Sequence, residues 1–191
     1  MNKTKVSKTV SYILRHHPED FDLKLAADAS VETDELLQAL RRKFEDITKT
    51  DLVQLVKNDS KGRFSFLDSK QRIRASYGHS IEGVNPDYQA VKPPDILYHG
   101  TRPEVKDKIL AAGLKPMGRN YVHLSVGIKE AEKVARRRTE RPIIFKIEAL
   151  KAFKSGQNFY KTAADIYLTD KVSIEYLLPE PILAAGEIYR R

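Results

Sequence analysis

Cysteine and tryptophan are both absent from this chain of 191 residues. Without cysteine there is no disulfide, no thiolate metal site and no thiol nucleophile, and the composition fits a reducing compartment. No apolar run approaches the roughly 20 residues that a membrane helix needs, and residues 1–10 carry no apolar signal core. We therefore expect a cytoplasmic protein that makes no contact with a membrane.

Three common nucleotide and metal signatures are also missing. The sequence has no G-x-x-x-x-G-K-[ST] phosphate loop, no G-x-G-x-x-G turn after a strand, and no His, Asp and Glu spacing typical of a metal site. These absences argue against kinases, ATPases, Rossmann dehydrogenases and zinc enzymes, and we predict no metal.

Positive charge is abundant and unevenly distributed. The net charge is +8, and residues 91–191 hold 19 basic and 12 acidic side chains. Residues 61–80 add a second concentration, with five basic side chains and one acidic. Such a surplus favours polyanionic partners such as RNA, DNA or nucleotides.

Residues 1–92 are predicted to form one lobe, because Pro93 and Pro94 end whatever precedes them. Apolar spacing predicts three helices, and a Thr48–Asp51 capping box fits the start of the third. Two short strands then flank Asp68, Ser69 and Lys70 as a hairpin. This order is typical of a winged helix-turn-helix. The expected helices are 5–15, 34–44 and 49–56, and the expected strands are 63–67 and 71–75.

Residues 93–191 are predicted to form a second, strand-rich lobe, so the fold class is α+β with a cleft between two lobes. The expected strands are 96–99, 121–125, 142–149, 166–170 and 175–179. The expected helices are 104–112, which Gly113 stops, and the basic segment 129–138.

Arginine and histidine side chains are the candidates for chemistry. Arg15 and His16 lie where Pro18 should end a helix, so they are either cations near a helix C-terminus or part of a site. Arg63 and Arg74 lie on the hairpin, which is either an exposed face or a wing that binds nucleic acid.

Two predicted strands of the second lobe each carry a histidine. His99 is followed by Gly100, which would let a ligand approach the backbone, and by Thr101. His123 is expected to point inward between Val122 and Leu124, and Ser125 follows. The alternative is that both histidines are structural residues within a sheet. The arginines of residues 132–141 are expected to form a solvated helix face that attracts RNA phosphates.

Seven stretches, in this order, resemble the RNA 2′-phosphotransferase family, whose members use NAD to remove an internal 2′-phosphate from RNA. They extend over nearly the whole chain. The stretches are VSYILRHHPE, TDELL, RFSF, RIRASYGHS, LYHGT, GLKPMGRNYVHLS and IYLTDKV. The resemblance implies a winged-helix lobe for RNA binding and catalysis, joined to an NAD-binding lobe of the ADP-ribosyltransferase type, in a monomer.

The resemblance implies two chemical steps. The RNA 2′-phosphate attacks the nicotinamide ribose of NAD and expels nicotinamide. The ribose 2″-hydroxyl then attacks phosphorus, which gives RNA with a free 2′-hydroxyl and ADP-ribose 1″,2″-cyclic phosphate. Many ADP-ribosyltransferases carry a catalytic glutamate near the last core strand, where this chain has Asp165 to Leu168. An ionised phosphate needs no such base.

The resemblance also assigns residues. It implies a catalytic group of Arg15, His16, Arg63 and Arg119. It implies NAD contacts from His99, Gly100, Thr101, His123, Leu124 and Ser125. It implies RNA contacts from Arg74, His79 and Ser80.

The chain departs from the family pattern in two places. Ser76 and Tyr77 replace an Asn-Gln pair, so we expect stacking of RNA on Tyr77 instead of an amide contact. Ala29, Ser30 and Val31 replace Gly-Trp-Val ahead of the second helix.

Two other functions remain open from the sequence. One is an ADP-ribosyltransferase that caps terminal phosphates of RNA or DNA. The other is a winged-helix nucleic-acid-binding protein without catalysis. Within the resemblance, the family's known target is a 2′-phosphate at a tRNA splice junction.

Overall fold

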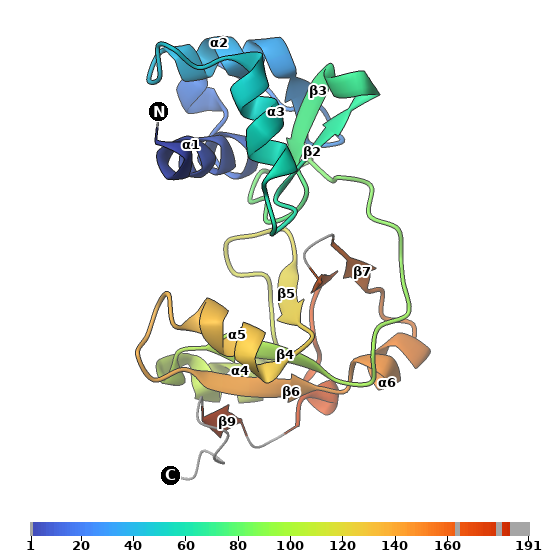
Figure 1. Ribbon diagram of the computed structural model, residues 1–191. Helices are drawn as coiled ribbons and strands as arrows, with labels where there is room; N and C mark the ends of the chain where they lie inside the picture. The colour runs from blue at the N-terminus through green and yellow to red at the C-terminus, as the bar shows by residue number, and fades with distance from the viewer. Residues whose placement is uncertain (1, 163–164, 179–180, 184–191) are drawn as a thin grey trace. The chain divides into compact units, whose positions relative to one another are not determined.

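The computed structural model describes residues 2–162, 165–178 and 181–183 and divides into two compact units (Figure 1). Of these residues, the first unit takes 2–88, 118–120 and 162, and the second takes the others. Both units contain helices and an antiparallel sheet, so the fold class is α+β. The first unit ends at Tyr88, four residues before the end of the expected lobe, and it includes a return of the chain at 118–120.

The first unit contains three helices, as predicted, and the predicted hairpin. The helical segments are α1 (Lys3–Arg15), η1 (Glu19–Phe21), α2 (Thr33–Arg41) and α3 (Lys49–Lys57). The strands are β1 (Ser30–Glu32), β2 (Phe64–Leu67) and β3 (Arg72–Ala75), and the 3-10 turn η2 (Asp68–Lys70) joins the last two. The sheet order is β1-β3-β2, all antiparallel. The sequence did not predict β1, because three residues are too few to show an alternating pattern.

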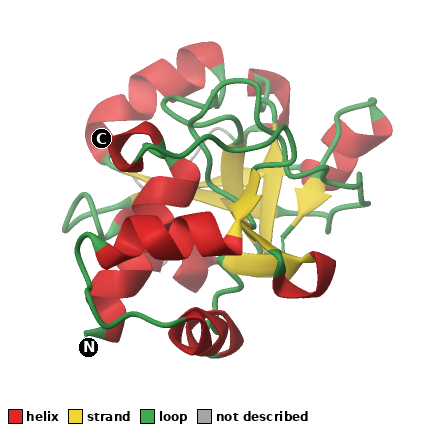
Figure 2. Ribbon diagram, turned by 90° about the horizontal axis from the view of Figure 1, so that it is seen from above, coloured by secondary structure: helices red, strands yellow, loops and turns green. Residues whose placement is uncertain are grey.

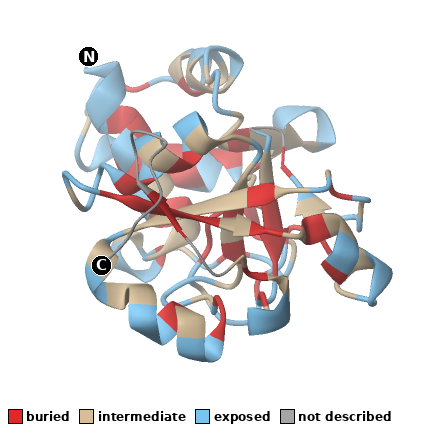
Figure 3. Ribbon diagram, turned by 90° about the horizontal axis from the view of Figure 1, so that it is seen from below, coloured by how far each residue is buried: buried red, intermediate tan, exposed pale blue. Residues whose placement is uncertain are grey.

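Local sequence explains where these helices begin and which face they bury. The predicted capping box is present, since Asp51 N–H donates to Thr48 Oγ1 at 3.2 Å and Thr48 N–H donates to Asp51 Oδ2 at 2.9 Å. The apolar stripe of α1 is buried in one core cluster with residues of α2, α3 and β3. Its members are Val6, Val10, Ile13 and Leu14. Figure 3 colours buried residues red.

The second unit is built on a six-stranded antiparallel sheet with the order β7-β8-β5-β4-β6-β9; helices and strands are distinguished in Figure 2. Its strands are β4 (Leu97–Thr101), β5 (Val122–Ser125), β6 (Ile143–Ile147), β7 (Tyr160–Lys161), β8 (Ile166–Thr169) and β9 (Ile182–Leu183). Its helical segments are η3 (Pro103–Val105), α4 (Lys106–Ala112), α5 (Ile128–Ala135), α6 (Ala149–Lys154) and η4 (Ile174–Tyr176).

Three predicted boundaries in the second unit were wrong. The basic helix ends at Ala135 instead of Arg138. The strand expected at 142–149 ends at Ile147, and α6 begins two residues later. The strand expected at 175–179 is instead η4 followed by one bridge between Leu177 and Ile147, and residue 179 lies outside the described residues. Short apolar runs do not distinguish a strand from a buried turn. Among the described residues, no helix is long and apolar enough to cross a membrane.

Helix α5 lies tightly against β4 at Gly100. A Cβ placed on Gly100 would come within 2.2 Å of the carbonyl oxygen of Ala131. Close packing of α5 therefore requires a glycine at this position.

We expect the Gly100→Ala substitution to destabilise the second unit by about 1–3 kcal/mol, because α5 must move away from β4 to admit the methyl group. The midpoint of denaturant unfolding checks this. The matched control is Gly118→Ala, since a Cβ there has no atom within 4 Å. Equal midpoints for the two variants would contradict the packing argument.

Candidate phosphate-binding site and strand histidines

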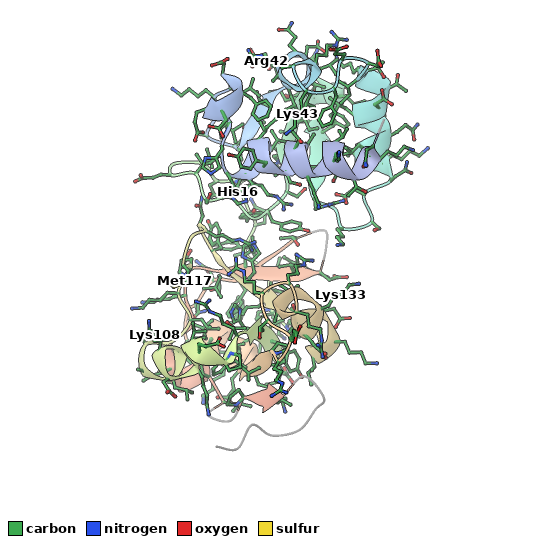
Figure 4. The ribbon with its side chains drawn as sticks, turned by 90° about the vertical axis from the view of Figure 1, so that its left-hand side faces the viewer. His16, Arg42, Lys43, Lys108, Met117 and Lys133 are labelled. Carbon is green, nitrogen blue, oxygen red and sulfur yellow. The ribbon has the colours of Figure 1, made fainter. Side chains whose placement is uncertain are left out.

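Helix α1 ends in the predicted cationic segment. Arg15 is its last residue and His16 is the C-cap, whose N–H donates to the carbonyl oxygen of Tyr12 at 3.0 Å. Figure 4 shows His16 at this end of the helix. The positive charge of Arg15 therefore lies at the negative end of the helix dipole, where it is favourable.

The Arg15 side chain turns inward and lies over an aromatic ring. Its guanidinium carbon is 4.8 Å from the centroid of Tyr77, a cation–π contact. Burial lowers the pKa of Arg15 from its ordinary value; Tyr77 opposes this shift, while Arg119 and Arg63 add to it. Nε and Nη2 are buried and have no hydrogen-bond partner among the described residues. Such donors suit an anion.

The Tyr77 ring is occupied by this contact. Tyr77 is only 8% exposed, and its hydroxyl donates to the carbonyl oxygen of Lys61 at 3.1 Å. Arg15 covers one face of the ring and little of the residue is accessible, which disfavours the expected stacking of RNA on Tyr77. The neighbouring Gly78 has a φ of +91°, and a Cβ there would lie 3.6 Å from Arg15. A glycine lets this turn follow the Arg15 side chain.

His16 is held by a serine of the same turn. Its Nδ1 lies 2.8 Å from Ser80 Oγ, and Ser80 donates from its N–H and its hydroxyl to the carbonyl oxygen of Arg15. The Ser80 hydroxyl lies 3.4 Å from that carbonyl; in the tautomer that carries the proton on Nδ1, His16 donates to the hydroxyl oxygen and Nε2 is the acceptor nitrogen. Burial, Arg119, Arg15 and His17 all lower the pKa of His16 below 6.5. The ring is therefore neutral near pH 7.

The neighbouring histidine turns away from this cluster. His17 stacks on Tyr12 with 4.9 Å between the ring centroids, and its Nδ1 lies 3.0 Å from Oε1 of Glu19. Half of the His17 side chain is exposed. The pair of histidines is thus divided between a site and a surface contact.

Arg63 is fixed by a carboxylate that the sequence did not single out. Its Nε donates to Asp59 Oδ1 at 2.8 Å, and its backbone N–H donates to Asp59 Oδ2. The Asp59 side chain is only 1% exposed, so this is a buried, charge-assisted contact. An acidic residue four positions before an arginine in a turn was the available signal. Without the fold it could not be told from a surface pair.

Arg119 lies in the segment 118–120, which belongs to the first unit although the chain before and after this segment belongs to the second. Its positive charge lowers the pKa of both Arg15 and His16. The next residue, Asn120, is bonded to the turn after β3. The four predicted catalytic residues, Arg15, His16, Arg63 and Arg119, therefore lie in one compact unit, with Arg15 interacting electrostatically with both other arginines.

The predicted RNA contacts are placed around the same turn. His79 is 3% exposed, and burial, Arg15, His16 and Arg74 lower its pKa to about 4. Arg74 donates from Nη1 to the carbonyl oxygens of Pro86 at 3.0 Å and Asp28 at 3.3 Å. Of the three, Ser80 is the exposed one. The buried His79 ring and the hydrogen bonds of Arg74 to backbone carbonyls thus stabilise the segment that follows β3.

In the second unit, His99 and His123 lie on neighbouring strands. Nδ1 of His99 is 3.0 Å from the carbonyl oxygen of His123, and Nδ1 of His123 is 3.0 Å from that of Tyr121. Because a carbonyl only accepts, each Nδ1 carries the proton. Both rings therefore have a fixed orientation and tautomer.

Burial alternates along β5, and this corrects one expectation. Val122 and Leu124 are buried, while His123 and Ser125 lie on the less buried face. His123 is therefore not directed inward with its neighbours. Leu124 is fully buried and belongs to the core of the second unit. Gly100 and Thr101, at the end of β4, are partly exposed.

Clustered arginines beside a neutral histidine suit a protein that binds phosphate groups. Comparison with known proteins identifies the class as phosphotransferases that act on RNA. Residues 1–171 match the family model described as RNA 2'-phosphotransferase, Tpt1 / KptA family, and the chain belongs to this family.

Curated relatives cover nearly the same length. A probable RNA 2'-phosphotransferase of Trichormus variabilis is 43% identical over 92% of this chain and 95% of its own. Proteins with the same description from Rhizobium leguminosarum bv. trifolii and Fusobacterium nucleatum subsp. nucleatum are 39% and 38% identical. They are covered over 95% and 98% of their lengths, and cover 93% and 92% of this chain.

We expect the His79 ring to titrate near pH 4 in histidine NMR spectra. Its folded pKa lies below the unfolded value of about 6.5, so the unfolded chain binds more protons between these values. Stability should therefore fall as the pH drops, by about 2 kcal/mol between neutral pH and about pH 5.

His79→Gln is the control, since it should remove this part of the pH dependence while leaving the carbonyl of residue 79 in place. Urea unfolding at both pH values measures the difference. A His79 ring that titrates at its ordinary pKa would refute the buried, neutral assignment.

Proposed function

We propose that this protein removes an internal 2′-phosphate from RNA with NAD as a consumed co-substrate. The observation that carries the proposal is the buried Arg15 guanidinium with two unpartnered nitrogens, beside further arginine charge from Arg63 and Arg119. Like charges repel at short range, so a dianionic phosphate is the ligand that offsets their repulsion best. Family membership supports the choice of a 2′-phosphate on RNA.

We further infer the two lobe types that the sequence suggests. The order α1-β1-α2-α3-β2-β3 and the three-stranded antiparallel sheet support a winged helix for the first unit. The six-stranded sheet with the two histidine-bearing strands supports an ADP-ribosyltransferase-type unit for the second.

The residues proposed for NAD have chemistry that fits a nucleotide. The protonated Nδ1 of His99 is engaged by a backbone carbonyl, so its Nε2 is an acceptor suited to a ribose hydroxyl. The hydroxyls of Thr101 and Ser125 lie on partly exposed strand ends and can donate to the same ligand. The other proposed contacts are Gly100, His123 and Leu124.

In the first proposed step, a 2′-phosphate oxygen of the RNA attacks the nicotinamide ribose carbon of NAD as the bond to nicotinamide breaks. In the second, the ribose 2″-hydroxyl attacks phosphorus and displaces the RNA 2′-oxygen, which leaves the phosphate as a cyclic ester on ADP-ribose. The proton of that hydroxyl ends on the RNA 2′-oxygen, so atoms and charge balance. The arginines supply the positive charge for both steps, and the proposal requires no metal.

Each arginine has a proposed task set by its contacts. Arg15 and Arg63 are held rigidly, by Tyr77 and Asp59, and would stabilise charge on the phosphorus oxygens in the second step. Arg119 would position the phosphate for the first step. A preorganised donor avoids the cost of reorganisation during the reaction, which is why fixed arginines suit the more highly charged transition state.

His16 is the proposed proton carrier. Since its pKa is lowered and its Nδ1 donates to Ser80, the ring is neutral and offers Nε2 as a base near pH 7. We propose that it first accepts the proton of the 2″-hydroxyl and then returns it to the RNA 2′-oxygen.

One assay tests the activity. Incubation with NAD and a 2′-phosphorylated RNA should release nicotinamide, dephosphorylate the RNA and form the cyclic phosphate in equal amounts. ADP-ribosylated RNA as the final product would favour capping of phosphates, and a terminally phosphorylated RNA tests that substrate. Binding without release of nicotinamide would identify a non-catalytic RNA-binding protein.

Substitutions should separate the two steps. We expect His16→Ala and Arg63→Ala to accumulate ADP-ribosylated RNA, and Arg119→Ala to slow its formation, each by about 10²–10³-fold. Single-turnover kinetics with labelled RNA measure both steps. Equal loss of both steps in all three variants would refute this division of tasks.

Asp59→Asn should lower the rate of the second step about tenfold, because it removes the charged partner of Arg63 while keeping the side-chain volume. Asp68→Asn is the matched control: Arg72 Nε donates to Asp68 at 2.6 Å with the same four-residue spacing, away from the proposed catalytic group. A second step equally affected in both variants would show a loss of stability instead of a loss of positioning.

A further inference from the structure

Asn120 makes three hydrogen bonds to the turn that follows β3. Its N–H donates to the carbonyl oxygen of His79 at 2.9 Å. Its Nδ2 donates to the carbonyl oxygens of Ile81 at 3.0 Å and Val84 at 3.1 Å. Asn120 is half-buried. Its two Nδ2 protons match two backbone acceptors, so its backbone and its side chain are both fixed.

The acceptors belong to the turn that also holds the end of α1. Ser80, between two of the carbonyls that Asn120 contacts, donates to the carbonyl of Arg15 and bonds His16. The turn is therefore bonded to the α1 end through Ser80 and to the 118–120 segment through Asn120.

We propose that Asn120 is the positioning residue for Arg119: its hydrogen bonds anchor the backbone of the segment so that the preceding guanidinium is kept beside Arg15 and His16. This inference rests on the proposed function for its catalytic importance, but its geometry stands without it.

A positioning device is needed here for a physical reason. Arg119 is exposed, and an arginine side chain loses rotamer entropy when it is ordered. Its charge is also repelled by Arg15. The three hydrogen bonds of Asn120 act against both effects, because they fix the backbone from which the Arg119 side chain extends.

Asparagine is well matched to this task. Aspartate would direct a carboxylate oxygen at the carbonyls of Ile81 and Val84 and so repel them. Alanine would leave both carbonyls without these donors. Serine keeps one donor on a shorter side chain and serves as a partial replacement.

The His16 ring reports on the position of Arg119. The charged and titratable groups around it are Arg15 and His17 from the end of α1, His79 from the turn, and Arg119 itself. If the Arg119 guanidinium moves away, a positive charge leaves the surroundings of His16. The pKa of His16 must then rise toward its ordinary value.

The test is histidine NMR titration of the full chain without substrate. We expect Asn120→Ala to raise the pKa of His16 in the same direction as Arg119→Ala, with Asn120→Ser between wild type and alanine. In the double variant Arg119→Ala, Asn120→Ala, the pKa should match that of Arg119→Ala alone, because the anchor no longer has a charge to position.

The matched control is Asn58→Ala, an exposed asparagine of the same unit whose Nδ2 lies 3.5 Å from Gln54. It should leave the pKa of His16 unchanged. The inference is overturned if Asn120→Ala and Asn120→Ser leave that pKa at the wild-type value, or if Arg119→Ala does so.

Kinetics then connect the anchor to the reaction. Asn120→Ala should slow the first step by about tenfold and leave the second step near its wild-type rate, whereas a loss of folding lowers both. Because the titration needs no substrate, a failed activity assay refutes the proposed function and leaves the result on Asn120 intact.

Discussion

Repulsion between like charges is the constraint on which the first unit's structure depends. Arg63 and Arg119 both act electrostatically on Arg15, and the burial of Arg15 weakens the screening that would otherwise relieve this repulsion. Each charge is therefore held by a different contact: the Tyr77 ring, the Asp59 carboxylate, and the anchored backbone beside Asn120. Only one of these contacts neutralises charge. The cluster as a whole retains its positive field, which is the property that recognition of a phosphate requires.

The turn after β3 connects these contacts. Gly78 leaves room beside Arg15, Ser80 bonds both the end of α1 and His16, and the carbonyl of His79 accepts from Asn120. The buried His79 ring carries no charge near neutral pH, so it fills the interior of the turn without adding to the repulsion. A single segment thus positions the helix end and the 118–120 segment together, which explains why a short stretch holds so many polar residues.

The second unit uses hydrogen bonds in place of charge. Two backbone carbonyls select the tautomer of His99 and His123, and the tight contact of α5 with Gly100 fixes the strand that carries His99. Rigid strands hold side chains more precisely than loops do, which suits the recognition of a defined small molecule. The exposed arginines of residues 136–138 lie beyond the last residue of α5, so they do not form the helix face expected of them.

The sequence by itself determined the α+β class, the three helices and hairpin of the first unit, the Thr48–Asp51 cap and the end of α1 before Pro18, because apolar periodicity, capping and proline act over a few residues. Its motifs also indicated the family. Only the tertiary structure decided the roles of Asp59 and Asn120, the closed face of Tyr77, the reason for Gly100 and the division of His16 from His17. Asn120 contacts carbonyls more than 35 residues away in the chain, and Tyr77 meets an arginine 62 positions before it. Contacts of that separation depend on packing, which local sequence patterns do not encode.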